Sequence, residues 1–241
     1  MSAFIKFFHI TLWQPLFNLL ILFYIYIPNL GVAIILLTVL IRVILYPLQA
    51  KAAKSQLALQ AIQPKLKEVQ KQHKDNKEEQ AKAMMALYKT EGINPFSGFL
   101  VMLIQFPILI VLYRLFWQGI QEENYQYLYS FVQRPETINA IFLGMNLNEP
   151  STVLAILVGI AFFAQAKLST PKKPAKSDKK GAGAMFGDMF QKQMLYVFPI
   201  FIVFILLRLP SALGLYLLIS GIFTAGQQYL AKKKRQEKEN V

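Results

Sequence analysis

Residues 30–48 read Leu-Gly-Val-Ala-Ile-Ile-Leu-Leu-Thr-Val-Leu-Ile-Arg-Val-Ile-Leu-Tyr-Pro-Leu. This stretch has the length and apolar composition of a transmembrane helix, yet Arg42 lies inside it. An arginine at the centre of a bilayer costs about 2.5–3.5 kcal/mol on insertion scales, so it normally faces a water-filled cavity or a partner. Thr38 lies four residues earlier, on the same helix face. The stretch therefore indicates a membrane protein with a hydrated, positively charged interior.

The composition supports an integral membrane protein. The chain has 241 residues, of which 55% are hydrophobic, and its mean hydropathy is +0.38. The absence of cysteine excludes disulfides, thiol catalysis, cysteine-ligated zinc and a lipid-modified N-terminal cysteine. His9 and His73 are far apart in sequence and lack a nearby carboxylate cluster, so we expect no metal site. No phosphate loop, nucleophile elbow or carboxylate pair is visible, and we expect neither enzymatic activity nor a cofactor.

Five stretches are predicted to span the membrane, and together they define an all-α membrane protein. The third and fourth are short, which favours a tilted helix or a locally thinned bilayer. The last two are separated by the predicted external turn 208–210, where Pro210 suits a tight turn. The predicted spans are residues 30–48, 99–117, 151–166, 194–207 and 211–230.

Residues 1–29 are predicted to form an N-terminal interfacial amphipathic helix. Within them, residues 10–27 are uncharged and apolar enough to span, but Thr11, Gln14 and Asn18 make one polar stripe. We therefore favour a helix lying on the membrane. A sixth span and an uncleaved signal anchor remain alternatives, and the absence of a small-residue cleavage pattern argues against a removed signal peptide.

The distribution of charge predicts the orientation. The predicted cytoplasmic hairpin 49–98 carries net charge +4, the linker-like loop 167–193 carries +5, and the tail 231–241 carries +3. The predicted external segment 118–150 carries net charge −3. Since positive loops remain in the cytoplasm, we expect the N-terminus outside, the C-terminus inside and a flexible cytoplasmic loop at 167–193.

Residues 49–98 follow the pattern of a helical hairpin. Asp75 and Asn76 mark the turn, with Asn76 a candidate cap for the second helix, and Gly92 and Pro95 end that helix. Two apolar stripes at helical spacing are predicted to pack on each other: Leu59, Ile62, Leu66 and Val69, and Ala81, Met84, Met85 and Tyr88.

The polar residues inside the predicted spans form the candidate binding site. No Asp or Glu occurs in any predicted span, which argues against a proton-coupled pump, and leaves a positive cavity that would attract an acidic or polar segment. Ser, Thr and Gln in spans also commonly hydrogen-bond only to neighbouring helices, so a purely structural role remains an alternative. The candidates are Arg42, Thr38, Gln105, Ser220, Thr224 and Gln227.

Six short segments, in order, resemble the YidC/Oxa/Alb-type membrane protein insertases. They lie along nearly the whole chain and come with a basic hairpin in the expected place, and Arg42 matches the arginine of the family's groove. The segments are Trp-Gln-Pro-Leu-Phe-Asn (13–18), residues 34–48 quoted above, Gly-Ile-Asn-Pro (92–95), Gln-Phe-Pro-Ile-Leu-Ile-Val-Leu-Tyr (105–113), Phe-Leu-Gly-Met-Asn-Leu (142–147) and Leu-Pro-Ser-Ala-Leu-Gly-Leu-Tyr (209–216).

This resemblance implies five transmembrane helices around a hydrophilic groove that is open to the cytoplasm and to lipid. Nascent membrane proteins would enter the groove, attracted by Arg42, and slide along spans two and four into lipid, alone or beside a Sec-type translocon. The chain resembles a short form without the large external domain of some members. The hairpin would guide substrate, and the basic tail would contact the ribosome or anionic lipids through Lys232, Lys233, Lys234 and Arg235.

Two other classes of protein remain as alternatives. A small-solute transporter or channel would also use a polar interior, although no internal repeat and no membrane acid support it. A scaffold that binds lipid or ribosomes would depend on the basic loops, which could equally be topology signals only. We expect a monomer in the plasma membrane of a bacterium, although the residues do not fix the oligomeric state.

Overall fold

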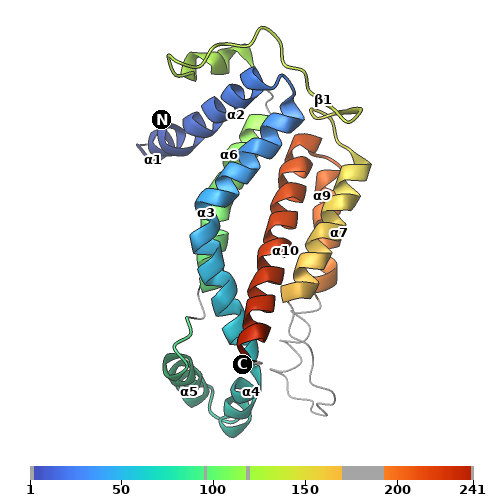
Figure 1. Ribbon diagram of the computed structural model, residues 1–241. Helices are drawn as coiled ribbons and strands as arrows, with labels where there is room; N and C mark the ends of the chain where they lie inside the picture. Colours follow the sequence, from blue (N-terminus) through green and yellow to red (C-terminus); the bar gives the residue numbers. More distant parts are fainter. Residues whose placement is uncertain (1–2, 95–96, 118–119, 170–192, 240–241) are drawn as a thin grey trace. The chain divides into compact units, whose positions relative to one another are not determined.

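The computed structural model describes residues 3–94, 97–117, 120–169 and 193–239, and these are mostly helical (Figure 1). The chain forms two compact units. Unit 1 comprises Met1–Ile44 and Phe106–Gly226, and unit 2 comprises Leu45–Gln105 and Gln227–Val241. Most of the loop predicted at 167–193 lies outside the described residues.

The N-terminal part of unit 1 is helical almost throughout. Helix α1 (Ala3–Phe8), a π-helical turn η1 (His9–Trp13) and α2 (Gln14–Tyr26) follow one another, and α3 begins at Leu30. Among the described residues, the stretches Lys6–Tyr26 and Leu30–Ala61 are long and apolar enough to cross a membrane, by length and composition. Both the interfacial helix and the sixth span therefore remain compatible with residues 10–27.

Helix α3 runs from Leu30 through Pro47 to Ala61, so it continues past the predicted span 30–48 into the predicted hairpin. The Ala-, Lys- and Gln-rich sequence after residue 48 has high helix propensity and continues the helix. The helix breaks at Ile62, directly before α4, where Pro64 lies at the start of the next helix. One predicted apolar stripe of the hairpin is therefore divided between two helices.

The remaining helices of unit 1 follow the predicted apolar stretches closely. They are α6 (Ser97–Trp117, of which residues 106–117 belong to unit 1), α7 (Thr152–Ser169), the π-helical turn η3 (Gln193–Val197), α9 (Phe198–Leu206) and α10 (Ser211–Glu239, of which residues 211–226 belong to unit 1). Helix α10 continues through the residues predicted as a separate tail after 230.

Glycines let α7 approach its two neighbours closely (Figure 1). A Cβ atom on Gly159 of α7 would lie 2.4 Å from Cγ2 of Val203 on α9. A Cβ on Gly214 of α10 would lie 3.1 Å from Leu154 of α7. Small residues of this kind allow helix backbones to pack tightly where van der Waals contact is the main attraction.

The segment between α6 and α7 packs on the N-terminal helix. It contains a 3₁₀ helix η2 (Glu122–Tyr127) and a β-hairpin of β1 (Ile141–Phe142) and β2 (Met145–Asn146). Asn18 of α2 is only 2% exposed, donates to the Tyr127 carbonyl (2.9 Å) and accepts from the Tyr129 N–H (2.7 Å). Gln14 also donates to the Tyr127 carbonyl. Two members of the predicted polar stripe therefore bind protein backbone.

Aromatic contacts and a cation–π pair lie in the same region. Trp13 stacks on Phe17 with centroids 5.0 Å apart, and meets Tyr127 edge-on at 5.6 Å. The Arg134 guanidinium lies 4.8 Å from the centre of the Tyr125 ring. Burial raises the pKa of the Tyr125 phenol, and the charge of Arg134 opposes that rise.

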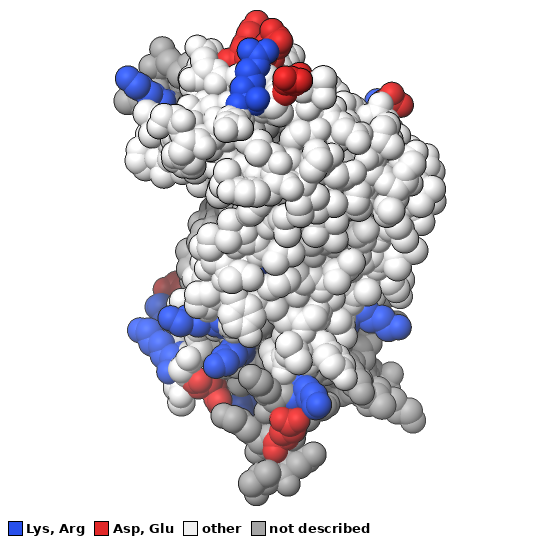
Figure 2. Space-filling view, turned by 45° about the horizontal axis from the view of Figure 1, so that its top comes forward, with Lys and Arg blue, Asp and Glu red and all other residues white. Residues whose placement is uncertain are grey.

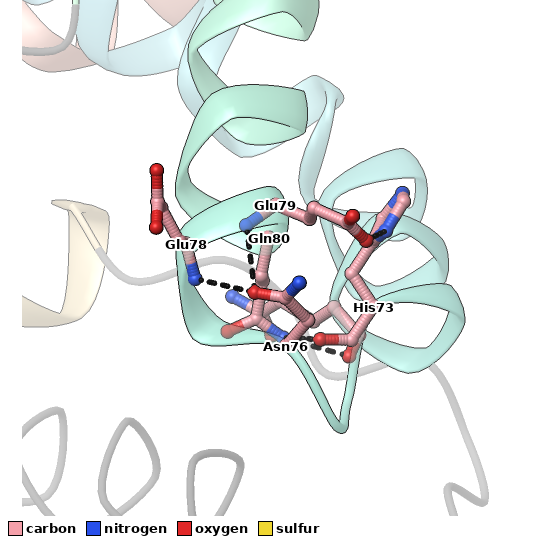
Figure 3. Close-up of polar contacts among 6 residues, drawn as sticks. His73, Asn76, Glu78, Glu79 and Gln80 are labelled. Atoms are coloured by element: carbon pink, nitrogen blue, oxygen red, sulfur yellow. Dashed lines mark hydrogen bonds and ion pairs between the residues drawn. The ribbon is translucent and has the colours of Figure 1, made fainter.

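Unit 2 contains the hairpin of α4 (Gln63–Gln72) and α5 (Lys77–Thr90), whose turn is shown in Figure 3. The Asn76 side-chain oxygen accepts from the N–H groups of Glu78 (3.1 Å) and Glu79 (3.2 Å), which confirms the predicted cap. Gln80 ties the helices together by donating to the Gln70 carbonyl at 2.8 Å.

The other end of α5 is closed by Gly92, as predicted. Gly92 has φ +65°, a conformation that glycine adopts without steric cost. Its N–H donates to the Lys89 carbonyl, and the N–H of Ile93 donates to the Tyr88 carbonyl. This pair of bonds is a Schellman motif, which satisfies the last carbonyls of the helix.

Asn76→Ala should loosen the hairpin, because two N–H groups of α5 lose their acceptor at a cost of about 1 kcal/mol. We expect faster hydrogen exchange in the first turn of α5, measured by mass spectrometry on the full chain. Asn76→Asp retains the acceptor and should exchange like the wild type. Equal exchange in all three proteins would contradict this role of Asn76.

Asn18→Leu should detach residues 125–129 from α2. The Tyr129 N–H would lose its side-chain acceptor and the Tyr127 carbonyl would keep only Gln14 as a side-chain donor, and a buried unsatisfied group costs about 1–3 kcal/mol. Thermal unfolding in detergent should therefore begin at a lower temperature. Thr11→Leu, in the preceding turn η1 and exposed, is the matched control and should leave the transition unchanged.

Candidate functional site

Arg42 is the centre of the candidate site and lies on α3 with an exposed fraction of only 7%. Its Nη1 donates to the Thr224 hydroxyl of α10 at 3.3 Å, across 182 residues of sequence. The Thr224 hydroxyl in turn donates to the Ser220 carbonyl at 2.9 Å. Unit 1 thus brings together an arginine and a threonine that the sequence had placed on two separate polar helix faces.

Thr38 and Ser220 lie one turn before these residues on the same two helices, and both are buried. The Thr38 hydroxyl donates to the Ile34 carbonyl of its own helix at 2.6 Å, so it satisfies itself without a partner helix. The Ser220 hydroxyl has no hydrogen-bond partner among the described residues. Of the two, Ser220 is the residue with an unused donor and acceptor.

The guanidinium of Arg42 is poorly satisfied within the part of the chain that the structure describes. Arginine carries five N–H donors and accepts nothing. Its Nε is buried and has no hydrogen-bond partner there, and no ion pair of the described residues includes Arg42. A buried charge needs acceptors to offset its lost hydration, so this arrangement favours water or an acceptor from another molecule.

Two other predicted residues, Gln105 and Gln227, belong to unit 2. Both are half-buried, and Gln105 has an interaction partner. The Nε2 of Gln227 has no hydrogen-bond partner among the described residues. Their predicted place beside Arg42 stays a prediction.

The basic cluster of the tail lies in the last turns of α10. Lys233 is exposed, and the side chains of Lys232, Lys234 and Arg235 lie outside the described part. Their contact with lipid or a ribosome stays a prediction.

Sequence reasoning missed two polar residues with helical spacing to the site. Tyr216 is 1% exposed, lies four residues before Ser220 and is close enough to Arg42 to interact electrostatically. Gln49 follows Arg42 by seven residues, which is two turns on the same face, and neither side-chain polar atom has a partner among the described residues. The helical spacing of residues 216, 220 and 224, and that of residues 38, 42 and 49, could have identified Tyr216 and Gln49 from the sequence.

Comparison with known proteins identifies the family. The model of the 60Kd inner membrane protein family matches residues 22–239. The chain belongs to this family, that of YidC and the Oxa-type proteins.

Two relatives carry the name membrane protein insertase YidC. The protein from Nitratidesulfovibrio vulgaris (strain DP4) is 32% identical over 221 residues, which cover 92% of this chain and 38% of the relative. The protein from Francisella tularensis subsp. novicida (strain U112) is 34% identical over 208 residues, which cover 86% of this chain and 33% of the relative. The chain thus spans well under half the length of these family members.

In this YidC-family chain, Thr224→Val should weaken the contact between α3 and α10. The substitution keeps the shape but removes the acceptor for Arg42, a loss of about 1.5 kcal/mol at the upper end for hydrogen bonds in membrane proteins. We expect a lower thermal transition in detergent. Thr224→Ser keeps a hydroxyl and should restore most of the stability. If valine and serine variants unfold alike, the hydrogen bond contributes nothing measurable.

Proposed function

We propose that this chain is a membrane protein insertase in which Arg42 receives the acidic or polar tail of a nascent membrane protein. The observation that carries the proposal is a buried guanidinium that donates to a neutral hydroxyl, that has no ion pair among the described residues and whose Nε has no hydrogen-bond partner there. Membership of the YidC family and the names of two relatives support the same activity.

The proposed architecture has five spans around a groove open to the cytoplasm, with the N-terminus outside. The spans correspond to α6, α7, α9, the first part of α3 and the first part of α10. The β-hairpin supports this topology, because it bonds to the first residues of both α3 and α10. These two helix starts therefore lie at one level, as the topology requires.

Whether Arg42 can recruit an acidic tail depends on how strongly its charge attracts a carboxylate inside the protein. Two opposite charges 4 Å apart attract by about 4 kcal/mol at an effective dielectric constant of 20, against about 1 kcal/mol in water. That gain is comparable with the cost of about 2.5–3.5 kcal/mol for arginine at membrane depth. The membrane potential, which is negative on the cytoplasmic side, favours outward movement of the acidic tail by about 2.3 kcal/mol per charge per 100 mV. No nucleotide is needed.

The apolar segment of the substrate would then move along α6 and α9. Helix α6 exposes a large apolar or aromatic side chain at residues 106, 110, 113 and 117, one helix face. Helix α9 carries a hollow of about 580 Å³ lined by Val197, Ile200, Phe201, Phe204, Ile205 and Arg208. Figure 2 shows a broad surface without charged side chains over the helices of unit 1. Such a surface suits lipid or an apolar helix.

We infer the partners of this chain from the positions of its positive charges. Nascent membrane proteins are the substrates, and the hairpin of unit 2 guides them to the groove. The basic end of α10 binds the ribosome or anionic lipid headgroups, where each Lys or Arg contributes about 1 kcal/mol near a charged surface. A Sec-type translocon acts beside the chain for larger substrates.

The decisive test is insertion of short-tailed, single-span proteins into proteoliposomes that contain this chain. Test tails carry zero, one or two acidic residues, and the variants are Arg42→Ala and Arg42→Lys. We expect alanine to reduce insertion most for the two-acid tail, by about tenfold for each 1.4 kcal/mol of lost attraction. Lysine should retain most activity, because it keeps the charge.

The pattern of insertion across the tails distinguishes an electrostatic role of Arg42 from a role in folding. If Arg42→Ala inserts every tail as well as the wild type, a charged groove is not the mechanism. If alanine reduces all tails equally and lowers the thermal transition, Arg42 acts through folding. Substitution of the four basic residues 232–235 by glutamine is the matched control, and the scaffold alternative predicts that this variant alone fails.

A further inference from the structure

The β-hairpin between α6 and α7 is fixed to the starts of two membrane helices. The Asn29 side chain donates to the Ile141 carbonyl at 3.1 Å, and the Leu30 N–H donates to the Asn139 carbonyl at 3.2 Å. A Cβ on Gly31 would fall 2.2 Å from the Phe142 ring, so α3 and the hairpin pack in direct contact. The hairpin is therefore held at the beginning of α3.

The start of α10 holds the other side of the hairpin. The Ser211 hydroxyl donates to the Asn146 carbonyl at 3.1 Å, and the Ala212 N–H donates to the Leu147 carbonyl at 3.0 Å. These contacts satisfy backbone donors that the first turn of a helix leaves free. Two helix ends thus determine the height of the hairpin along the helix axes.

The tip of this fixed hairpin is an exposed leucine in a strained conformation. Leu143 is 82% exposed and has φ +50°, and Gly144 follows with φ +78°. Two-residue turns of this kind favour Asn-Gly or Asp-Gly, since a branched apolar side chain is disfavoured at positive φ. Among the non-glycine residues that the structure describes, Leu143 alone has this backbone conformation. A polar residue would suit both water and the turn better.

The surroundings of the tip resemble a membrane–water boundary. Ile141 of β1 is 51% exposed. Tyr26 and Ile27 are 77% and 43% exposed, and they precede Asn29, the residue that binds the Ile141 carbonyl. Residues 141–145 carry no charge. Tyrosine beside exposed aliphatic side chains is typical of the interfacial belt of membrane proteins.

We propose that the tip of the β-hairpin, Leu143 with Ile141, inserts into the outer leaflet at the boundary between headgroups and acyl chains. The occupant is phospholipid, because the bonds to Asn29, Leu30 and Ser211 place the apolar tip where two membrane helices begin. Burial of Leu143 in lipid offsets the strain of its backbone. The anchor rests on the topology proposed above, and not on insertase activity.

The test uses the absence of cysteine in the native chain, which makes any introduced cysteine unique. Leu143→Cys is labelled with an environment-sensitive fluorophore and reconstituted into phosphatidylcholine–phosphatidylglycerol vesicles. Glu136→Cys, exposed on the same segment, is the aqueous control, and Ile160→Cys, 60% exposed in the middle of α7, is the lipid control. Quenching is measured with external iodide and with lipids that carry a quencher near the headgroup.

We expect the label at 143 to be quenched severalfold less by iodide than the label at 136, and strongly by the shallow lipid quencher. Iodide quenching equal to that at 136 would overturn the anchor. Protection from iodide without lipid quenching would also overturn it, since protein would then cover the tip. A label at 160 that iodide quenches as strongly as the label at 136 would show that the topology itself is wrong.

Because the label is itself apolar, a second variant tests the native side chain. Leu143→Asn suits positive φ, so the turn should fold at least as well, and thermal unfolding in detergent should not occur earlier. With the label on Ile141→Cys, Leu143→Asn should increase iodide quenching severalfold relative to the same label beside leucine. Unchanged quenching would show that Leu143 anchors nothing.

Discussion

The hydrogen bond from Arg42 to Thr224 is the constraint on which the rest of unit 1 depends. It joins α3 to α10 one turn from the buried polar side chains of Thr38 and Ser220, and it involves a charge that no ion pair among the described residues neutralises. A hydroxyl is a weak partner for a guanidinium with five donors. The fold therefore holds the charge in place and leaves the buried Nε of Arg42 without a hydrogen-bond partner among the described residues.

The segment between α6 and α7 connects several helices of unit 1. Asn18, Asn29 and Ser211 each bind backbone of the segment between α6 and α7, so α2, α3 and α10 share one set of contacts. Specific polar contacts of this kind fix helix ends, whereas apolar packing in a membrane leaves helices free to slide. The site is thus held from one end, while α6 and α9 present apolar surface.

Local signals predicted much of this structure. The spacing of Thr38 and Arg42, the spacing of Ser220 and Thr224, and the cap at Asn76 each depend on neighbours within two helical turns, and such neighbours are visible in sequence. The contact of Asn18 with Tyr127 spans 109 residues and could not be read from a polar stripe. The apolar run that ends at residue 48 marks a predicted span and gives no helix boundary, so it did not reveal that α3 continues past Pro47 to Ala61.

The long sequence separation between Arg42 and its acceptor has a consequence for biosynthesis. Because Thr224 lies 182 residues after Arg42, the ribosome completes α3 long before the hydroxyl exists. In the proposed topology the guanidinium enters the bilayer during that interval without its eventual neighbour, at a depth where charge is costly. A chain proposed to help others past this barrier then meets the same barrier first in its own synthesis, where the arrival of α10 relieves it.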